Sequence, residues 1–295
     1  MKNIFFALTA SIFLFASCDY VEVPHQAGGS VVVPTSDTVR KIFIEDFTGH
    51  TCPNCPKAAR QIDTLKQRFP GQIISMAIHT PVFGTPCPPA PLPAGATAGT
   101  FTEDFRVTQE DVDYDNLFQV NSFPYPSLFV NRSGYPASMI IGEGVQTDDS
   151  VAHVIVKPIT AYLKITPNYN STTRALTVNV SGKFMHDTSG TFNIAIYLTE
   201  DSLTGAQEDN TASSGFDYNY VFNDVFRGCV NSPGSISGAQ AITGTITANT
   251  GINYTSTASY SVPAVCIPAH CHVVAILYKT SDYGILQAAE SKLIP

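Results

Sequence analysis

The first structured stretch of the chain changes from a strand-like to a helix-like pattern of apolar residues. Residues 39–47 (VRKIFIEDF) alternate apolar and polar positions and predict a strand. Residues 56–69 place apolar side chains three and four positions apart, which predicts a helix that stops before Pro70. Residues 73–78 (IISMAI) predict a second, more buried strand. The pattern therefore predicts a strand–helix–strand unit.

The second half of the chain follows a strand period almost throughout. A short helix over 147–156, with Thr147 as its cap, is expected to close the first half. Alternating segments separated by Gly, Asn, Ser and Pro come after it. These segments are 176–180, 192–198, 218–226, 241–248, 257–262 and 272–278. About seven or eight short strands predict an antiparallel β-sandwich, immunoglobulin-like (Ig-like) in outline.

The N-terminal segment has the pattern of a secretion signal. Residues 1–17 carry Lys2 and an apolar run that is shorter than the ~20 residues needed to span a bilayer. The segment 14–18 (LFASC) resembles a bacterial lipobox, which implies cleavage before Cys18 and lipidation of that cysteine. The alternative is ordinary cleavage that leaves Cys18 a plain thiol. Residues 18–38 contain Pro, Gly and Ser without a helical period and are expected to form a tether.

Composition narrows the class of protein. Hydrophobic residues make up 44% of the 295 residues, which is enough to form a core and excludes a wholly disordered chain. The net charge of −8 argues against a nucleic-acid partner. Seven cysteines, together with a secretion signal, indicate an oxidising compartment in which disulfides form. We expect no cofactor.

A Cys-x-x-Cys motif lies at the predicted start of the first helix. The partial positive charge of a helix N-terminus favours the thiolate of Cys52, which is the form that attacks disulfides. Cys55 lies one turn further on and could resolve the mixed disulfide. The same spacing suits half of a zinc site, but that site needs a second pair of ligands.

These residues resemble the thioredoxin-like fold. Asp46 lies six residues before Cys52, where thioredoxins carry a proton-accepting aspartate. The segment 123–134 resembles the segment of thioredoxins that contains a cis-proline. The resemblance implies that Pro126 follows a cis bond, faces the cysteine pair and exposes backbone to an extended peptide. We therefore predict an α/β thioredoxin-like domain over 39–157, followed by an all-β antiparallel sandwich domain over 158–295.

More narrowly, the chain resembles the outer-membrane-protein-twenty-eight family of Gram-negative surface lipoproteins. The lipobox, the run 45–56, the pair 78–79 and an all-β second half ending in 286–289 carry the resemblance. It implies a lipid anchor in the outer membrane, on its periplasmic or its surface-exposed face. The expected partners are proteins or peptides that carry thiols or disulfides, or other surface partners.

Three further residues are candidates for an auxiliary role near the cysteine pair. His50 and His79 could stabilise a thiolate, or could be polar residues that satisfy loops. Cys87 lies in a proline-rich insertion over 80–100 that excludes regular structure. It could be a third redox thiol, a disulfide partner that ties down this loop, or a spare thiol. The acidic segment 104–117 is expected to be weakly helical, solvated surface.

The second half contains the three cysteines Cys229, Cys266 and Cys271. With the intervening histidines they could form a zinc site, but their spacing is not a familiar zinc pattern and secretion favours disulfides. We expect no metal and predict that Cys229 pairs with Cys266 or Cys271. The third cysteine would then join Cys87 or stay free.

Two functions remain open on this pattern. In the first, Cys52 and Cys55 exchange disulfides with extracytoplasmic proteins, Asp46 moves protons and Pro126 positions a peptide. In the second, the protein is a non-enzymatic adhesin, binding or assembly lipoprotein whose cysteine pair is a structural disulfide.

Overall fold

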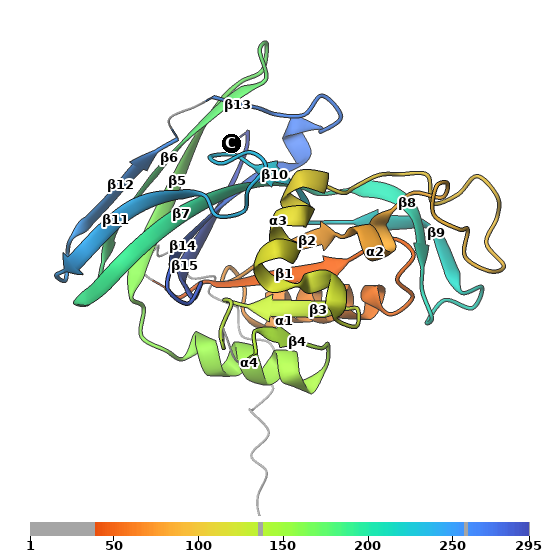
Figure 1. Ribbon diagram of the computed structural model, residues 1–295, viewed down its shortest axis with the longest axis horizontal. Helices are drawn as coiled ribbons and strands as arrows, with labels where there is room; N and C mark the ends of the chain where they lie inside the picture. The colour runs from red at the N-terminus through yellow and green to blue at the C-terminus, as the bar shows by residue number, and fades with distance from the viewer. Residues whose placement is uncertain (1–38, 135–137, 257–258, 295) are drawn as a thin grey trace, which may run out of the picture. The chain divides into compact units, whose positions relative to one another are not determined.

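The computed structural model describes residues 39–134, 138–256 and 259–294 (Figure 1). The predicted signal peptide, Cys18 and the tether lie outside the described residues. The helices are α1 (Cys55–Arg68), α2 (Pro81–Gly84), α3 (Thr108–Phe118) and α4 (Val145–Ile155), with short 3₁₀ turns at Val120–Ser122 and Pro268–His270. The strands are β1 (Ile42–Thr48), β2 (Ile73–His79), β3 (Ser127–Val130), β4 (Ile140–Ile141), β5 (Ala161–Asn170), β6 (Ala175–Phe184), β7 (Thr188–Glu200), β8 (Leu203–Glu208), β9 (Phe216–Phe222), β10 (Val225–Cys229), β11 (Ala239–Ile246), β12 (Gly251–Thr255), β13 (Tyr260–Ser261), β14 (Cys271–Lys279) and β15 (Ile285–Lys292).

A nine-stranded mixed sheet runs through both halves of the chain in the order β15-β14-β7-β10-β2-β1-β3-β4, with β11 paired to β7. β1 and β2 are parallel, whereas β3 runs antiparallel to β1. β10 joins β2 where Val225 lies opposite Ala77, and the Ala77 amide donates to the Asp224 carbonyl at 2.8 Å. The predicted boundary between residues 157 and 158 falls between α4 and β5. The two halves therefore share one sheet across that boundary.

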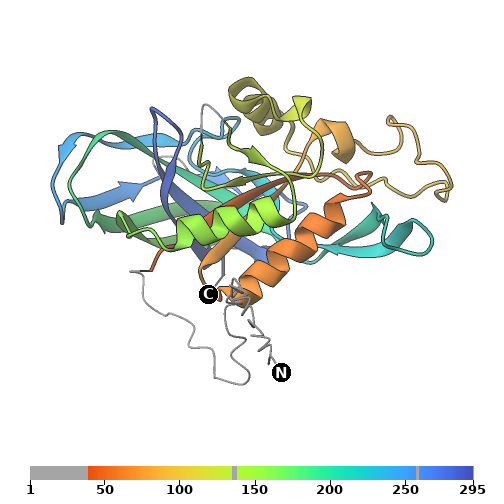
Figure 2. The ribbon, with the colours of Figure 1, turned by 90° about the horizontal axis from the view of Figure 1, so that it is seen from below.

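The alternation of β1 divides its side chains between two cores. Ile42 and Ile44 pack against α1 and α4, which lie on the same face of the sheet (Figure 2). Phe43 and Phe47 belong to the core on the opposite face. Complete burial of such a side chain contributes roughly 1.5–3 kcal/mol, so both faces of this strand stabilise the fold.

Helix α3 corrects one expectation, because the acidic segment that contains it is not solvated surface. Tyr114 and Phe118 pack into the core beneath Phe43 and Phe47. Glu110 is also buried, and its carboxylate accepts hydrogen bonds from the Gly234 amide at 3.0 Å and the Cys229 amide at 3.3 Å. The acidic side chain therefore satisfies backbone donors that lie more than a hundred residues away, which charge patterning along the chain does not reveal.

The predicted sandwich of antiparallel strands is confirmed in the second half. β5, β12 and β13 all pair with β6, and this four-stranded sheet packs on the β7, β11 and β14 part of the main sheet. Val178 and Val180 of β6 share a core with Ile194 and Ile196 of β7. The immunoglobulin-like outline stays a prediction.

Helix α4 starts earlier than the predicted cap implies. It begins at Val145, and Gly144, with a φ of 96°, takes the N-cap position in place of Thr147. The Thr147 hydroxyl instead donates to the Gly142 carbonyl at 2.8 Å. Glycine adopts such a positive φ without the steric cost that a side chain brings, so the start of the helix is set by this residue.

Candidate functional site

The cysteine pair lies where β1 gives way to α1. A disulfide joins Cys52 to Cys55, and Cys55 is the first residue of the helix. The Cys52 amide donates to the Gly49 carbonyl at 3.0 Å, so a tight turn returns the chain toward the sheet before the helix starts. The partial positive charge of the helix N-terminus is therefore directed at this pair.

A hairpin from the second half, β8–β9, covers the disulfide. The Gln207 side-chain amide donates to the Cys52 carbonyl at 3.0 Å and lies 3.4 Å from the Gly49 carbonyl. The Glu208 amide donates to the His50 carbonyl at 2.8 Å, and the Asn210 amide donates to the Pro53 carbonyl at 2.9 Å. Cys52 is 1% and Cys55 is 2% exposed. The disulfide is therefore closed off by a segment about 155 residues away in sequence, which local motif reasoning missed.

Helix α2 closes the turn from another side, and it corrects the expectation that the insertion over 80–100 has no regular structure. The Thr51 amide donates to the Phe83 carbonyl at 3.1 Å. A Cβ atom on Gly49 would lie 2.2 Å from the Phe83 carbonyl carbon, so only glycine allows this close approach. Because Gly49 has no side chain, the insertion over 80–100 can pack directly against the turn that carries the cysteines.

Asp46 lies on the α1 side of β1 and is 4% exposed. Its Oδ1 atom has no hydrogen-bond partner among the residues that the structure describes. Burial, and to a smaller extent the charge of Asp224, raises the pKa of Asp46 from 3.8 to about 7. An unpaired carboxyl of this kind gains or loses its proton near neutral pH, which is typical of groups that move protons.

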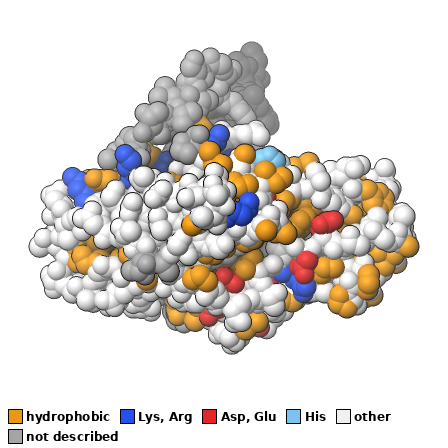
Figure 3. Space-filling model, turned by 90° about the horizontal axis from the view of Figure 1, so that it is seen from above, with side chains coloured by type: hydrophobic (Ala, Val, Ile, Leu, Met, Phe, Trp, Pro, Cys, Tyr) orange, Lys and Arg blue, Asp and Glu red, His pale blue; other side chains and the backbone are white. Residues whose placement is uncertain are grey.

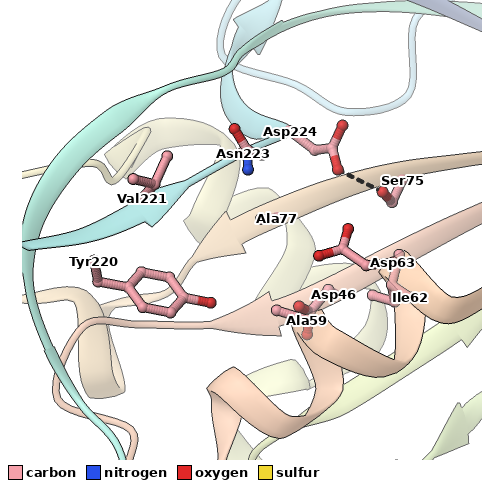
Figure 4. Close-up of a pocket in the computed structure, with 10 residues that line it drawn as sticks. All are labelled: Asp46, Ala59, Ile62, Asp63, Ser75, Ala77, Tyr220, Val221, Asn223 and Asp224. Atoms are coloured by element: carbon pink, nitrogen blue, oxygen red, sulfur yellow. Dashed lines mark hydrogen bonds between the residues drawn. The ribbon is translucent and has the colours of Figure 1, made fainter. Parts of the chain in front are cut away.

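Two small cavities meet at Asp46. The first, of about 60 Å³, is also lined by Asp63, Tyr220 and Asp224, with Asp224 accepting a hydrogen bond from Ser75 (Figure 4). The second, of about 40 Å³, is lined by Asp46 together with Cys55, His79, Gln207 and Tyr220. Asp46 therefore borders both the cavity that Cys55 lines and the acidic cavity beside it.

The two candidate histidines occupy different surroundings. His79 lies edge-on to Phe105 and Phe222, with ring centroids 5.3 Å from each, and burial lowers its pKa to about 3. Its ring nitrogens find no hydrogen-bond partner within the described part of the chain. His50 is held by the Thr85 carbonyl at 3.2 Å, and burial also lowers its pKa. Both rings are therefore neutral at pH 7, so neither supplies a positive charge to a thiolate.

Pro126 is preceded by a cis peptide bond from Tyr125. It is buried, and β3 begins at the next residue, with Ser127 opposite Phe47 of β1. Phe83 of α2 meets the Tyr125 ring edge-on at 5.3 Å. Helix α2 therefore lies next to the backbone beside Pro126 at which we expected a peptide to bind.

The predicted pairing of Cys229 with Cys266 or Cys271 is wrong. Cys229 is a free thiol on the core face that contains α3, whereas Cys266 and Cys271 belong to the sandwich core on the other face of the sheet. The sheet itself separates them. Cys87 is also a free, buried thiol, 3.3 Å from the Pro91 carbonyl, and burial raises its pKa, so it is not placed as a reactive thiolate.

Among the described residues, one group has the spacing of metal ligands. Glu200, Cys266 and Cys271 bring their ligand atoms within 4.8 Å of one another. The Arg227 guanidinium lies 3.3 Å from the Cys266 sulfur and 3.2 Å from the Glu200 carboxylate. A fixed cation at this position opposes a second one, so we assign no metal to the group.

Comparison with known families identifies the class of protein. The model of the family described as outer membrane protein Omp28 matches residues 111–294, which is more than half of the chain. The chain therefore belongs to the Omp28 family, and the expected outer-membrane location is confirmed. The matched segment contains the covering hairpin and the sandwich, while Cys52 and Cys55 precede it.

A solved structure with the same family name is also similar to this chain. It is the crystal structure of a domain of the outer membrane lipoprotein Omp28 from Porphyromonas gingivalis, with 17% sequence identity. The match covers 47% of this chain and 91% of that one, with a TM-score of 0.29. No curated protein sequence matches the chain significantly. In the part of the chain that the structure describes, no helix is long and apolar enough to cross a membrane.

Proposed function

We propose that this outer-membrane protein exchanges disulfides with extracytoplasmic proteins through Cys52 and Cys55. The observation that carries the proposal is the placement of Asp46. Its buried carboxyl, with a pKa raised to about 7 by burial, lines the same cavity as Cys55. A group that changes protonation near pH 7 beside a sulfur leaving group is suited to general acid–base catalysis.

The arrangement of the first half supports a thioredoxin-like domain. The strand order β2-β1-β3-β4 combines a parallel β1–β2 pair with antiparallel β3 and β4. Helices α1 and α4 share a core on one face of this sheet, and the disulfide lies at the start of α1. The cis bond before Pro126 precedes β3, as the resemblance to thioredoxins implies.

The exchange transfers two electrons between the cysteine pair and a dithiol substrate and needs no other oxidant or reductant. A substrate thiolate attacks Cys52, the bond between the cysteines breaks, and Cys55 leaves as a thiolate that takes a proton from the Asp46 carboxyl. The cavity of about 40 Å³ that both residues line can hold a water molecule to carry that proton. A second substrate thiolate then attacks the mixed disulfide and releases Cys52. The substrate is oxidised and the cysteine pair is reduced; the reverse steps reduce a substrate disulfide.

The covering hairpin sets a condition for this chemistry. With Cys52 and Cys55 nearly inaccessible, a protein substrate reaches the sulfur only when the segment around Gln207 moves away. Hydrogen bonds to the cysteine turn and an ion pair between Arg60 and Asp209 at 2.9 Å hold the segment around Gln207. Phe222 of the same hairpin also packs against His79 and Phe105. The polar contacts are individually worth about 1 kcal/mol, so the proposal requires local opening around Gln207 rather than displacement of the whole hairpin.

The proposal includes the lipid anchor. The resemblance of residues 14–18 to a lipobox supports cleavage of a signal peptide over 1–17 and lipidation of Cys18. Several acyl chains hold a protein firmly on a membrane. Intact-mass measurement of the membrane fraction tests this part, because Cys18→Ser should lose the acyl mass and the membrane association.

A second candidate function is favoured by the burial of the cysteine pair. In it, the protein is a non-enzymatic binding, adhesin or assembly lipoprotein, and the disulfide only ties the turn to α1. The face seen from above carries few charged side chains (Figure 3), which suits contacts with other surface components as much as solvation.

An assay of insulin reduction in the presence of dithiothreitol separates the two functions. We expect the purified chain to accelerate insulin reduction, Cys52→Ser to abolish the effect, and Asp46→Asn to reduce it. Cys229→Ser is the matched control, because it removes a buried thiol on the far side of the sheet, and it should keep full activity. Equal background rates for the wild type and Cys52→Ser would overturn the redox function and favour the structural disulfide.

A further inference from the structure

A second pair of cysteines lies at the other end of the main sheet. Cys266 belongs to the loop between β13 and the turn Pro268–His270, and Cys271 is the first residue of β14. In the β14–β7 pairing, Cys271 lies opposite Glu200. The two sulfur atoms and the Glu200 carboxylate all lie within 4.8 Å of one another.

The loop that carries Cys266 is anchored on both sides of the cysteine. The Arg174 guanidinium donates to the Val262 carbonyl at 3.0 Å and to the Cys266 carbonyl at 2.9 Å. The Ile267 amide donates to the Glu200 carboxylate at 2.6 Å. The two sulfurs are therefore held near each other by backbone contacts that do not involve the sulfurs themselves.

The environments of the two thiols differ. The neighbouring Cys271 thiol and then the Arg227 guanidinium, 3.3 Å from the Cys266 sulfur, lower the pKa of Cys266 despite its burial. The Cys271 thiol donates to the Ile267 carbonyl at 3.4 Å, and the neighbouring Cys266 sulfur and then burial raise its pKa. Glu200 and Tyr260 also face the pair and partly oppose the thiolate. The result is one sulfur suited to attack and one suited to resolve.

The residues on either side of Cys266 lie at the surface. Val265 and Ile267 are 74% and 50% exposed, whereas Cys266 itself is 3% exposed. A disulfide reagent therefore reaches the Cys266 sulfur only when this loop opens locally, and a small reagent needs less opening than a protein does.

We propose that Cys266 and Cys271 form a second thiol–disulfide site, which reacts with low-molecular-weight disulfides independently of Cys52 and Cys55. The Cys266 thiolate attacks the disulfide RSSR, forms a mixed disulfide with one R–S group and releases the other as a thiolate. The Cys271 thiol then gives its proton to the released R–S thiolate, and its sulfur attacks the Cys266 sulfur and releases the second R–S group. Two cysteine thiols are oxidised to one disulfide, and RSSR is reduced to two RSH.

The test uses oxidised glutathione as the disulfide and the full chain as the protein. The reduced protein is incubated with mixtures of oxidised and reduced glutathione, quenched in acid, alkylated after unfolding and digested with chymotrypsin. Cleavage after Tyr260 places Cys266 and Cys271 on one peptide, apart from Cys229. We expect this peptide to lose two hydrogens in a two-electron transition, while Cys229 remains alkylated.

Two matched variants establish which sulfur attacks. Cys271→Ser should accumulate a glutathione adduct on Cys266, whereas Cys266→Ser should leave Cys271 without an adduct. Arg227→Gln should slow alkylation of Cys266 about tenfold at pH 7, because a neighbouring cation lowers a thiol pKa by about one unit or more. Arg227→Lys should restore part of the rate.

In the wild type, the pH profile gives a readout that needs no variant. Iodoacetamide should modify Cys266 at a lower pH than Cys229, whose pKa burial raises to about 12. The proposal is overturned if no bond between Cys266 and Cys271 forms at any glutathione ratio. It is equally overturned if either residue instead pairs with Cys229, or if Cys271 is the residue that carries the adduct.

Discussion

Two neighbouring carboxylates on β1, Glu45 and Asp46, are both buried but point to opposite faces of the sheet. Glu45 accepts a hydrogen bond from the Tyr114 hydroxyl at 2.6 Å and from the Arg132 guanidinium at 2.8 Å. Asp46 faces α1, where its Oδ1 has no partner among the described residues and where burial raises its pKa to about 7. The two buried carboxyls thus differ in their partners: Glu45 is satisfied by a hydroxyl and a guanidinium, whereas Asp46 is not.

The difference shows where stability and chemistry are placed in this sheet. The Glu45 side carries a closed network of opposite charges and hydroxyls, which holds the first half to the second through Tyr197 and Tyr278 beside Arg132. The Asp46 side leaves a carboxyl free to exchange its proton next to the disulfide. An unpaired buried carboxyl costs stability, so its presence beside Cys55 favours a role in chemistry.

The largest effect is expected on the Glu45 side. Arg132→Met leaves the Glu45 charge buried without its partner, so the free energy of unfolding should fall by about 3–5 kcal/mol. Urea denaturation of the purified chain measures the change. Lys57→Met is the control, because Lys57 pairs with Glu143 at the exposed surface and should cost at most about 1 kcal/mol. Similar losses in the two variants would contradict the distinction between a buried network and surface charge.

On the Asp46 side, a substitution should raise the free energy of unfolding instead of lowering it, and the size of the change should depend on pH. The folded state keeps the Asp46 proton between about pH 4 and pH 7, whereas the unfolded state releases it. The stability that this proton confers is present at low pH and is lost as the pH rises through about 7. Asp46→Asn cannot ionise, so it should match the wild type near pH 4 and exceed its stability at pH 8 by about 4 kcal/mol. A difference between the two proteins that does not change with pH would refute the raised pKa.

The covering hairpin provides a smaller, kinetic test. Gln207→Ala removes the side-chain bond to the Cys52 carbonyl, so opening of the hairpin becomes easier by about 1.4 kcal/mol. Reduction of the Cys52–Cys55 disulfide by dithiothreitol should then be about tenfold faster. Gln146→Ala, at an exposed position of α4, is the matched control and should leave the rate unchanged. An unaltered rate in Gln207→Ala would show that this bond does not limit access.

The ion pair at the edge of the hairpin should matter least. Arg60 is 47% exposed in its pair with Asp209, and exposed pairs contribute at most about 1 kcal/mol. Arg60→Ala should therefore accelerate reduction of the disulfide by less than about fivefold, and high salt should abolish the difference from the wild type. An acceleration larger than that of Gln207→Ala would contradict the expectation that this ion pair holds the hairpin less strongly than the Gln207 hydrogen bond does.

Local patterns predicted much of the first half because its elements are decided by nearby residues. Alternation in β1, the three- and four-residue spacing in α1 and the Cys-x-x-Cys motif are all contained within short windows of sequence. The antiparallel strands of the sandwich follow from the same alternation. Asp46 was singled out by the resemblance to thioredoxins, although its raised pKa depends on the three-dimensional surroundings.

The features that sequence reasoning missed depend on contacts between distant residues. Gln207 lies in an ordinary strand-like stretch, and nothing in that stretch predicts that it bonds to the Cys52 turn. The sequence suggests that Glu110 is solvated, whereas in the structure it accepts a hydrogen bond from the Gly234 amide. Cys229 looks available to Cys266 until the strands are assembled and the sheet separates the two cysteines.

The reduction potential of the Cys52–Cys55 disulfide tests the central claim most directly. It can be measured by equilibrating the full chain with dithiothreitol or glutathione buffers and mapping the alkylated peptide that contains both cysteines. A disulfide that takes part in exchange should have a potential between about −120 and −270 mV. A potential below about −300 mV would mark a structural bond and contradict the account.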